Sequence, residues 1–208
     1  MAVSNQERTL PDAEERGARA RTARLMLDTA VHLMQSGVVP SVSDVAEAAE
    51  VSRATAYRYF PSQAALVHAV VDAALGPILD WTSQSADAGE RTRDLLERSL
   101  PRIDAFEATF RAALKLSLDQ WAQRQAGTLG NEPAFTRGHR VDLLRDAIAP
   151  LRGRVSDADF DRLAKALSLL FGIEALIVMK DIWGASAEEA QDIVQWAAAV
   201  LVRSIAPA

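Results

Sequence analysis

The sequence predicts an all-α protein of about nine helices, and three observations support that prediction. Apolar residues make up 49% of the chain and recur at helical spacing from about residue 18 onward. Only 6% of the residues are aromatic, which disfavours strands. The 208 residues include just 10 glycines and 8 prolines, fewer turn signals than an all-β protein needs. A chain of this length can bury a sizeable core.

Composition also limits the chemistry that the chain can perform. The sequence has no cysteine, which excludes disulfides, thiolate nucleophiles and cysteine-ligated metals. Its three histidines, at positions 32, 68 and 139, do not form a metal-binding pair, so we expect no metal and no other cofactor. The first seventeen residues lack the apolar core of a secretory signal. We therefore expect a cytoplasmic protein with no membrane partner.

The first helix is predicted over residues 18–35, because one face of it is apolar. The residues on that face are Ala23, Leu27, Ala30, Val31 and Met34, and Gly37 follows as a stop. We assign residues 1–17 to a flexible N-terminal arm. Four arginines lie at or just before the helix, namely Arg16, Arg19, Arg21 and Arg24.

Two short helices and one longer helix are predicted next. The first short helix begins at Ser41, whose hydroxyl precedes an acidic residue by three positions, and it ends near Ala49. Ser52 caps the second, which runs from Arg53 to about Phe60 because proline follows. The longer helix starts at Ser62 and is expected to bend or end at Gly76-Pro77.

The remaining helices are separated by four stretches that carry turn residues, at 86–90, 127–133, 149–156 and 183–186. Capping boxes begin two of the helices that follow, at Ser156 and Ser186. The run ALSLLFGIEALIVM at 166–179 is too short to span a bilayer, so we interpret it as a helix buried on nearly all sides. The last helix, 187–205, is apolar on two sides.

The pair of short helices at 41–60 has the spacing of a helix-turn-helix. Such a pair needs small residues where the helices pack and an apolar residue in the turn, which Ala46, Ala49 and Val51 supply. In this motif the second helix enters the major groove of DNA. The alternative interpretation is a plain helical hairpin with a solvated polar face.

The second short helix carries side chains suited to a DNA duplex. Arg53 can bind guanine through two hydrogen bonds, and Thr55 can contact a base or a thymine methyl. Arg58 and the hydroxyls of Tyr57 and Tyr59 can bind phosphate. The arginines before the first helix are then either a solvated helix start or a basic arm that contacts the DNA backbone or minor groove.

Residues 41–71 resemble the N-terminal DNA-binding domain of tetracycline-repressor-type (TetR family) transcriptional regulators. The shared framework AxxAxVSxxTxYxYFxS is present as Ala46, Ala49, Val51, Ser52, Thr55, Tyr57, Tyr59, Phe60 and Ser62. The resemblance implies that Thr55 and Tyr57 contact bases and backbone, that Tyr59 meets DNA, and that Ser43 reaches a phosphate. With the motif, it places the DNA contacts at Ser43, Arg53, Ala54, Thr55, Tyr57, Arg58, Tyr59 and Gln63.

Two residues depart from the pattern of the family. Glu50 stands before the turn valine, where the family usually has glycine in a left-handed conformation, so we expect a small loss of stability. Gln63 stands where the family usually has a phosphate-binding lysine, so that contact would be uncharged and less dependent on salt.

We expect the C-terminal third to form a homodimer. A monomer of this size can cover one face of the apolar helices, and covering the other requires a partner. Helices 157–182 and 187–205 of each chain are therefore predicted to form a four-helix interface, as the resemblance also implies.

The resemblance implies a ligand cavity among the middle helices, about residues 90–150. The large apolar candidates are Trp81, Phe106, Phe110, Trp121, Phe135, Phe171, Met179 and Trp183. For each of them, the alternative is that the side chain packs in the core and contacts no ligand. The polar candidates are His139, Gln120 and Glu174. Glu174, a carboxylate in an apolar helix, needs a partner, and an arginine across the dimer ranks before a ligand.

The sequence thus predicts a DNA-binding transcriptional regulator with an arm at 1–17, a helix-turn-helix domain at 18–62, and a ligand-binding and dimerisation domain at 63–208. The expected mechanism is release of a repressor from a palindromic double-stranded operator by a small apolar effector. One alternative is a ligand-independent architectural DNA-binding protein. The other is an all-helical enzyme, which the sequence disfavours because it has no phosphate loop and no nucleophile elbow.

Overall fold

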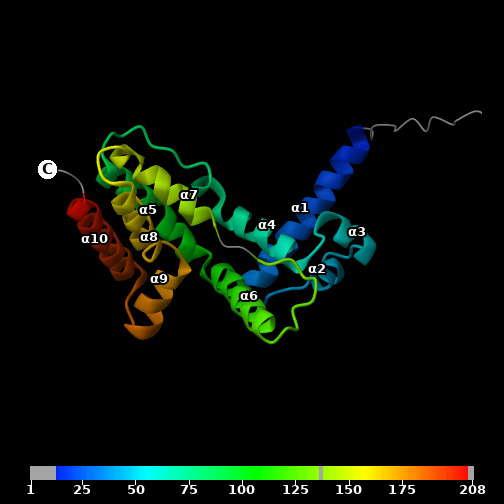
Figure 1. Cartoon of the computed structure of the whole chain (residues 1–208). Helices are drawn as coiled ribbons and strands as arrows, with labels where there is room; N and C mark the ends of the chain where they lie inside the picture. The colour runs from blue at the N-terminus through cyan, green and yellow to red at the C-terminus, as the bar shows by residue number, and fades with distance from the viewer. Residues whose placement is uncertain (1–12, 136–137, 206–208) are drawn as a thin grey trace, which may run out of the picture.

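Three helices pack around a small apolar core at the N-terminal end of the chain (Figure 1). The structure is a computed structural model that describes residues 13–135 and 138–205. The three helices are α1 (Ala13–Gln35), α2 (Val42–Ala48) and α3 (Arg53–Tyr59). Ser41 begins α2 with the predicted capping box, in which its side chain and that of Asp44 each accept the other's backbone N–H.

The core of this domain contains apolar residues of both short helices. Val45, Ala46, Ala49, Ala56 and Phe60 are all buried, and the burial of Ala46 and Ala49 confirms the close packing expected of the pair. On α1 the buried residues are Met26, Ala30 and Met34, at i, i+4 and i+8. The face of α1 that meets the core is therefore turned from the predicted one, and Leu27 and Val31 lie only at its margin.

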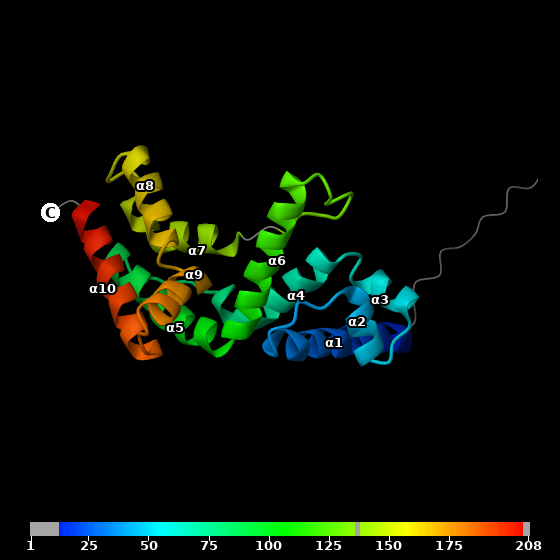
Figure 2. The same cartoon turned by 90° about the horizontal axis from the view of Figure 1, so that it is seen from below.

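Helix α4 (Gln63–Leu75) connects this domain to the rest of the chain, as both views show (Figures 1 and 2). It ends before the short 3₁₀ turn η1 (Gly76–Ile78), as the Gly-Pro pair predicts. The elements beyond it are α5 (Ala88–Ala105), α6 (Glu107–Gln125), α7 (His139–Ala147), η2 (Ala149–Leu151), α8 (Asp157–Ser168), α9 (Ile173–Ile177), η3 (Val178–Ile182) and α10 (Ala187–Ile205).

The C-terminal half is built around α5, α8 and α10, which lie together at the end of the molecule far from α3 (Figure 1). The buried residues of α10 are four apart along one stripe, at Ala190, Val194, Ala198 and Val202. This stripe packs against α5 and α8, so the opposite stripe of α10 is left facing outward. Within the described residues, no helix has both the length and the apolar character that crossing a membrane requires.

Several predicted boundaries are corrected by the structure. The first helix begins at Ala13, so residues 13–17 are helical and were wrongly assigned to an arm; residues 1–12 lie outside the described part of the chain. The predicted break at 86–90 is present but was placed too late, because α5 already begins at Ala88. The described residues form ten α-helices, in agreement with the prediction of about nine, and an unexpected break at Phe106 separates α5 from α6.

The prediction of one continuous helix across 157–182 is also wrong. The chain leaves α8 after Ser168 and turns through Gly172, whose φ of 120° suits glycine and strains any other residue. It resumes as α9 and then widens into the π-helical turn η3. Leu169 in the turn and Val178 in η3 are exposed, so the apolar run has two distinct sides.

Candidate functional site

Helix α3 presents its polar side chains to solvent because its apolar ones hold it to the core. Ala56 is fully buried and Phe60, the C-cap residue, is nearly so. The helix contains two arginines and no acidic residue, and Arg53, Ala54, Tyr57 and Arg58 are exposed. Thr55 and Tyr59 are half-buried. Six of the predicted DNA-contacting residues are thus brought together on one short helix with a cationic outer face.

The start of α3 is fixed by local hydrogen bonds. The Ser52 side chain accepts the backbone N–H of Thr55 at 3.2 Å and donates its own hydroxyl to the Thr55 hydroxyl oxygen at 2.9 Å. These bonds hold the Thr55 side chain in one orientation at the first turn. The other predicted contact, Ser43 on α2, lies beside Tyr57, with the two hydroxyl oxygens 3.5 Å apart.

The turn between α2 and α3 has the backbone expected from the sequence. Glu50 has a φ of 54°, which confirms the left-handed conformation at this position. Its N–H bonds the Glu47 carbonyl and the Val51 N–H bonds the Ala46 carbonyl, the two bonds that define a Schellman end. The turn therefore sets the angle between the helices with backbone bonds, at the cost of one strained residue.

Gln63 lies at the start of α4 but its side chain is used within the protein. The amide nitrogen donates to the carbonyls of Pro40 at 3.1 Å and Val39 at 3.4 Å. The amide thereby ties α4 to the segment that precedes α2. Gln63 therefore stabilises the helix-turn-helix from within the protein. Only its amide oxygen remains to accept a hydrogen bond at a DNA interface, for example from a water molecule bound to a phosphate.

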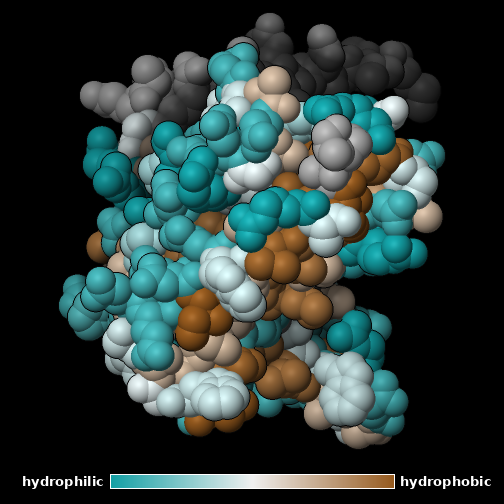
Figure 3. Space-filling view, turned by 90° about the vertical axis from the view of Figure 1, so that its left-hand side faces the viewer, coloured by the Kyte–Doolittle hydropathy of each residue, from teal (hydrophilic) through white to brown (hydrophobic). Residues whose placement is uncertain are grey.

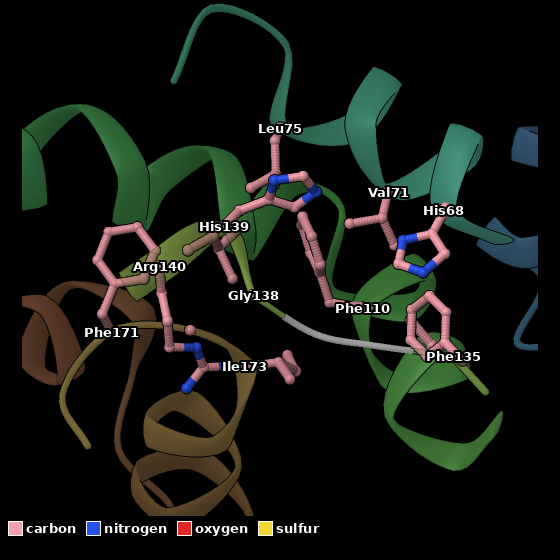
Figure 4. A pocket seen from close by; sticks show the side chains of 13 residues that line it. His68, Val71, Leu75, Phe110, Phe135, Gly138, His139, Arg140, Phe171 and Ile173 are labelled. Carbon is pink, nitrogen blue, oxygen red and sulfur yellow. The ribbon is translucent and has the colours of Figure 1, made fainter. Parts of the chain in front are cut away.

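A cavity lies where α4 meets the C-terminal helices (Figure 4). Its wall includes two of the histidines and three of the phenylalanines, drawn from elements far apart in the sequence. The lining residues named in Figure 4 are His68, Val71, Leu75, Phe110, Phe135, Gly138, His139, Arg140, Phe171 and Ile173. The predicted candidates Phe110, Phe135, His139 and Phe171 are thus brought together.

The other predicted cavity residues lie elsewhere. The Trp81 indole donates to Asp94 at 2.7 Å, and the Arg102 guanidinium lies 5.1 Å above the Phe106 ring, so both rings are occupied outside the cavity. Trp121 is 59% exposed on α6, and Trp183 is exposed after η3. Met179 is half-buried against the core and is absent from the lining.

Gln120, another predicted cavity residue, does not line the cavity but supports the backbone of its wall. It is 2% exposed. Its amide nitrogen donates to the Pro133 carbonyl at 3.2 Å, and its amide oxygen accepts the Phe135 N–H at 2.7 Å. The side chain therefore holds the backbone that delivers the Phe135 ring to the cavity.

Glu174 pairs with an arginine, as its position in an apolar run predicts, but the arginine belongs to the same chain. The Arg140 guanidinium donates to both Glu174 oxygens at 2.8 and 3.1 Å and to the Ser168 carbonyl at 3.1 Å. A Cβ on Gly172 would approach this guanidinium to 2.8 Å. Arg140 thereby joins α7 to the end of α8 and the start of α9.

The residues of α4 that line the cavity were not among those predicted from the sequence. His68, Val71 and Leu75 line it at i, i+3 and i+7 of α4, a spacing that identifies a helix face but not what the face meets. Arg140 was missed because the polarity of its guanidinium conceals that its stem covers an apolar wall.

The end of α4 is attached to the C-terminal half by two polar contacts. The Asp72 carboxylate lies 2.7 Å from Nε2 of His139, a residue that also lines the cavity. Arg102 of α5 donates from NH2 to the Ala73 carbonyl at 3.1 Å and from Nε to the Ala74 carbonyl. These carbonyls lie in the last turn of α4, where an arginine is favourably placed. The two contacts thus connect the end of α4 to the cavity wall and to α5.

Exposed apolar side chains form a band over the turn after α8, η3 and α10. We call it the apolar seam, and Figure 3 shows brown side chains running between hydrophilic margins on this side of the molecule. Ile182, Trp183 and Trp196 are 73%, 76% and 67% exposed. The other members are Leu169, Val178, Ile193 and Val200. An exposed apolar patch is typical of an interaction surface.

A charged cluster anchors η3, and with it one edge of the seam. The Lys180 ammonium binds Glu107 at 2.6 Å and also Asp104, while Arg111 binds Glu107 at 2.7 Å and both oxygens of Asp181 at 2.7 Å. Burial raises the pKa of Glu107, but the hydrogen bonds from Lys180 and Arg111 outweigh it and hold that pKa below its ordinary value.

The fold and the exposed α3 define a helix-turn-helix protein. Its N-terminal domain, α1–α3, which we call the reading domain, is joined by α4 to a larger helical domain with a cavity. Residues 27–70 match the family model of the tetR family of bacterial regulatory proteins.

A curated relative extends the likeness beyond the motif. The chain is 39% identical over 89 residues to the HTH-type transcriptional repressor LfrR of Mycolicibacterium smegmatis, a match that spans 43% of this chain and 45% of the repressor. The chain thus matches less than half the length of that relative.

The whole fold is similar to that of a solved regulator. A TetR transcriptional regulator from Rhodococcus sp. RHA1 superposes with a TM-score of 0.56 over 90% of this chain and 97% of its own, at 20% identity. At that identity the likeness concerns the fold alone.

Proposed function

We propose that this protein is a dimeric transcriptional regulator that binds a two-fold symmetric operator and leaves it when a small effector enters the cavity. The observation that carries the proposal is the outer face of α3, where Arg53, Thr55, Tyr57 and Arg58 project from a helix whose other side is buried. Side chains of these types bind phosphates and base edges, and a seven-residue helix fits the major groove.

The apolar seam supports the dimer in this proposal. Pairing two seams removes three largely exposed side chains, Ile182, Trp183 and Trp196, from water. The seam lies at the end of the molecule opposite α3 (Figure 1). A two-fold dimer can then present two copies of α3 to successive major grooves, about 34 to 36 Å apart.

Helix α4 supports the release step. It follows α3 after a short turn and contributes His68, Val71 and Leu75 to the cavity wall. An effector that widens the cavity pushes on α4 and strains the Asp72–His139 contact, which shifts α3 relative to its copy in the partner. A coupling of about 1 to 3 kcal/mol empties the operator at ordinary concentrations. That the curated relative is a repressor supports negative regulation.

The test of operator binding is selection of bound fragments from a random double-stranded DNA library with the purified chain. We expect enrichment of a palindromic sequence. Thr55→Ala is expected to relax specificity at a half-site position and Arg58→Ala to weaken binding to all sequences, because a phosphate contact carries no sequence information. The matched control is Arg154→Ala, in the turn before α8.

Three results would contradict the proposal. The first is retention of fragments without sequence preference, which indicates an architectural DNA-binding protein instead. The second is an equal loss of affinity for Arg58→Ala and Arg154→Ala, which removes α3 from the interface. The third is enrichment of non-palindromic single sites, which argues against a two-fold dimer.

A further inference from the structure

We infer that the effector is an uncharged aromatic compound with a single ring. The inference rests on the proposed function in treating the cavity as the effector site, and it adds the chemical class of the ligand. Three features of the wall carry it: the rings that line it, the pairing of its charged groups, and its size.

The wall is aromatic on several sides. Phe110 comes from α6, Phe135 from the segment before α7, and Phe171 from the turn before α9, so the rings surround the space and do not stack on one another (Figure 4). His68 lies against Phe135 with ring centroids 4.5 Å apart and planes tilted by 49°. A flat ring entering between them gains edge-to-face and offset contacts in addition to apolar burial.

The charged groups at the wall already have partners within the protein. Arg140 donates to both oxygens of Glu174, and His139 is 2.7 Å from Asp72. An anionic ligand would have to draw Arg140 from Glu174, and a cationic one would have to draw a carboxylate from Arg140 or His139. Burying a charge without a partner costs far more than a ring gains, so the wall selects a neutral molecule.

The cavity is small. It holds about 70 Å³, whereas an engineered apolar cavity that binds benzene has roughly 150 Å³. One ring therefore enters with a limited displacement of the wall, and a fused two-ring compound requires a much larger one. Close-packed interiors resist local compression, so the ring cannot be accommodated by compressing the wall. The displacement is instead taken up by a shift of the helices that end at the cavity.

Three ligands that differ only in charge test the inference. Toluene, benzoate and benzylammonium each carry one ring and one substituent. Calorimetric titration into the DNA-free protein should give saturable binding of toluene, with benzoate and benzylammonium at least about tenfold weaker, a difference of about 1.4 kcal/mol. Scanning calorimetry should show a higher melting temperature with toluene alone. Equal or tighter binding of either ion overturns the inference, and so does tighter binding of naphthalene than of toluene.

Cavity-filling variants assign the binding to this site. Ala113→Leu on α6 adds three carbons to the wall and should abolish toluene binding. Ala122→Leu makes the same change on an exposed face of α6 and should leave it unchanged. Should Ala113→Leu melt below room temperature, Ile103→Phe fills the cavity from α5 instead. Toluene binding that survives a folded, filled variant contradicts the assignment.

The same preparations separate this inference from the proposed function. A protein that selects a palindromic fragment but does not bind toluene leaves the regulator in place and refutes the ligand class. A protein that binds toluene at the cavity but keeps the fragment at saturation supports the ligand class and refutes the release step.

Discussion

Single residues in this protein accept strain where the chain must turn sharply. Glu50 lies in the left-handed region between α2 and α3, where a residue with a Cβ pays a steric cost. The two backbone bonds of the Schellman end hold it there. A glycine at this position removes the strain but loses more entropy on folding, so the net gain is smaller than the strain itself.

We therefore expect Glu50→Gly to stabilise the chain by about 0.5 to 1 kcal/mol in urea unfolding followed by circular dichroism. Glu47→Gly, inside α2, makes the same chemical change in a helical conformation and should destabilise by a similar amount. If both variants lose stability equally, the turn is not strained in solution.

Arginines at helix ends hold the elements together. Arg102 donates to the last carbonyls of α4, and Arg140 donates to the carbonyl of Ser168 at the end of α8. Arg91 of α5 donates to the carbonyls of Asp146 at 2.8 Å and Ala147 at 3.2 Å, at the end of α7. Each guanidinium satisfies carbonyls that the helix itself leaves unpaired. The relative placement of α4, α7 and α8 therefore depends on long cationic side chains as well as on apolar packing.

The charged cluster on η3 gives a prediction at the scale of the element. Glu107→Gln should lower the free energy of unfolding by about 1 to 2 kcal/mol at pH 7, because it weakens the hydrogen bonds from Lys180 and Arg111. The pKa of Glu107 and that of Asp181 lie below their ordinary values. Their contribution is thus complete above the ordinary carboxyl pKa values and is lost as the pH falls through the lowered ones.

The difference between the wild type and Glu107→Gln should therefore shrink below about pH 4 in urea titrations at several pH values. Glu97→Gln, on the exposed side of α5, serves as the control and should differ little from the wild type at any pH. A Glu107→Gln difference that stays constant down to pH 3 argues against the ionic role of the cluster.

At the scale of the whole molecule, a large apolar surface of the described residues lies far from α3, and we propose that it sets the association state. Trp196→Glu places a charge in the middle of the apolar seam and should convert a dimer into a monomer in sedimentation velocity at micromolar concentration. Operator affinity should fall with it, since one α3 alone contacts half the site.

Trp121→Glu is the matched control for the seam. Trp121 is 59% exposed, close to the 67% of Trp196, but it lies on α6 away from the seam. We expect this variant to sediment as the wild type does. A wild-type chain that is already a monomer, or a loss of association in both variants, removes the seam as the interface.

The helix-turn-helix was readable from the sequence because its determinants are local. Ser41 and Ser52 are caps, Ala46 and Ala56 are small where helices touch, and each of these residues does in the structure what its type and spacing predict. The break after Ser168 was not readable. Gly172 was the only signal, and the apolar residues on both sides of it gave the period of one continuous helix.

The amino-acid sequence by itself determined the helices of the reading domain, the conformation of Glu50 and the need of Glu174 for a cation, because each depends on neighbours in the chain or on the chemistry of one residue. The tertiary structure alone decided which aromatic side chains meet in a cavity. Phe110, Phe135 and Phe171 line the cavity and Trp121 does not. Which side chains meet there depends on how five distant segments pack. That packing is a balance of many small contacts, which no local sequence pattern encodes.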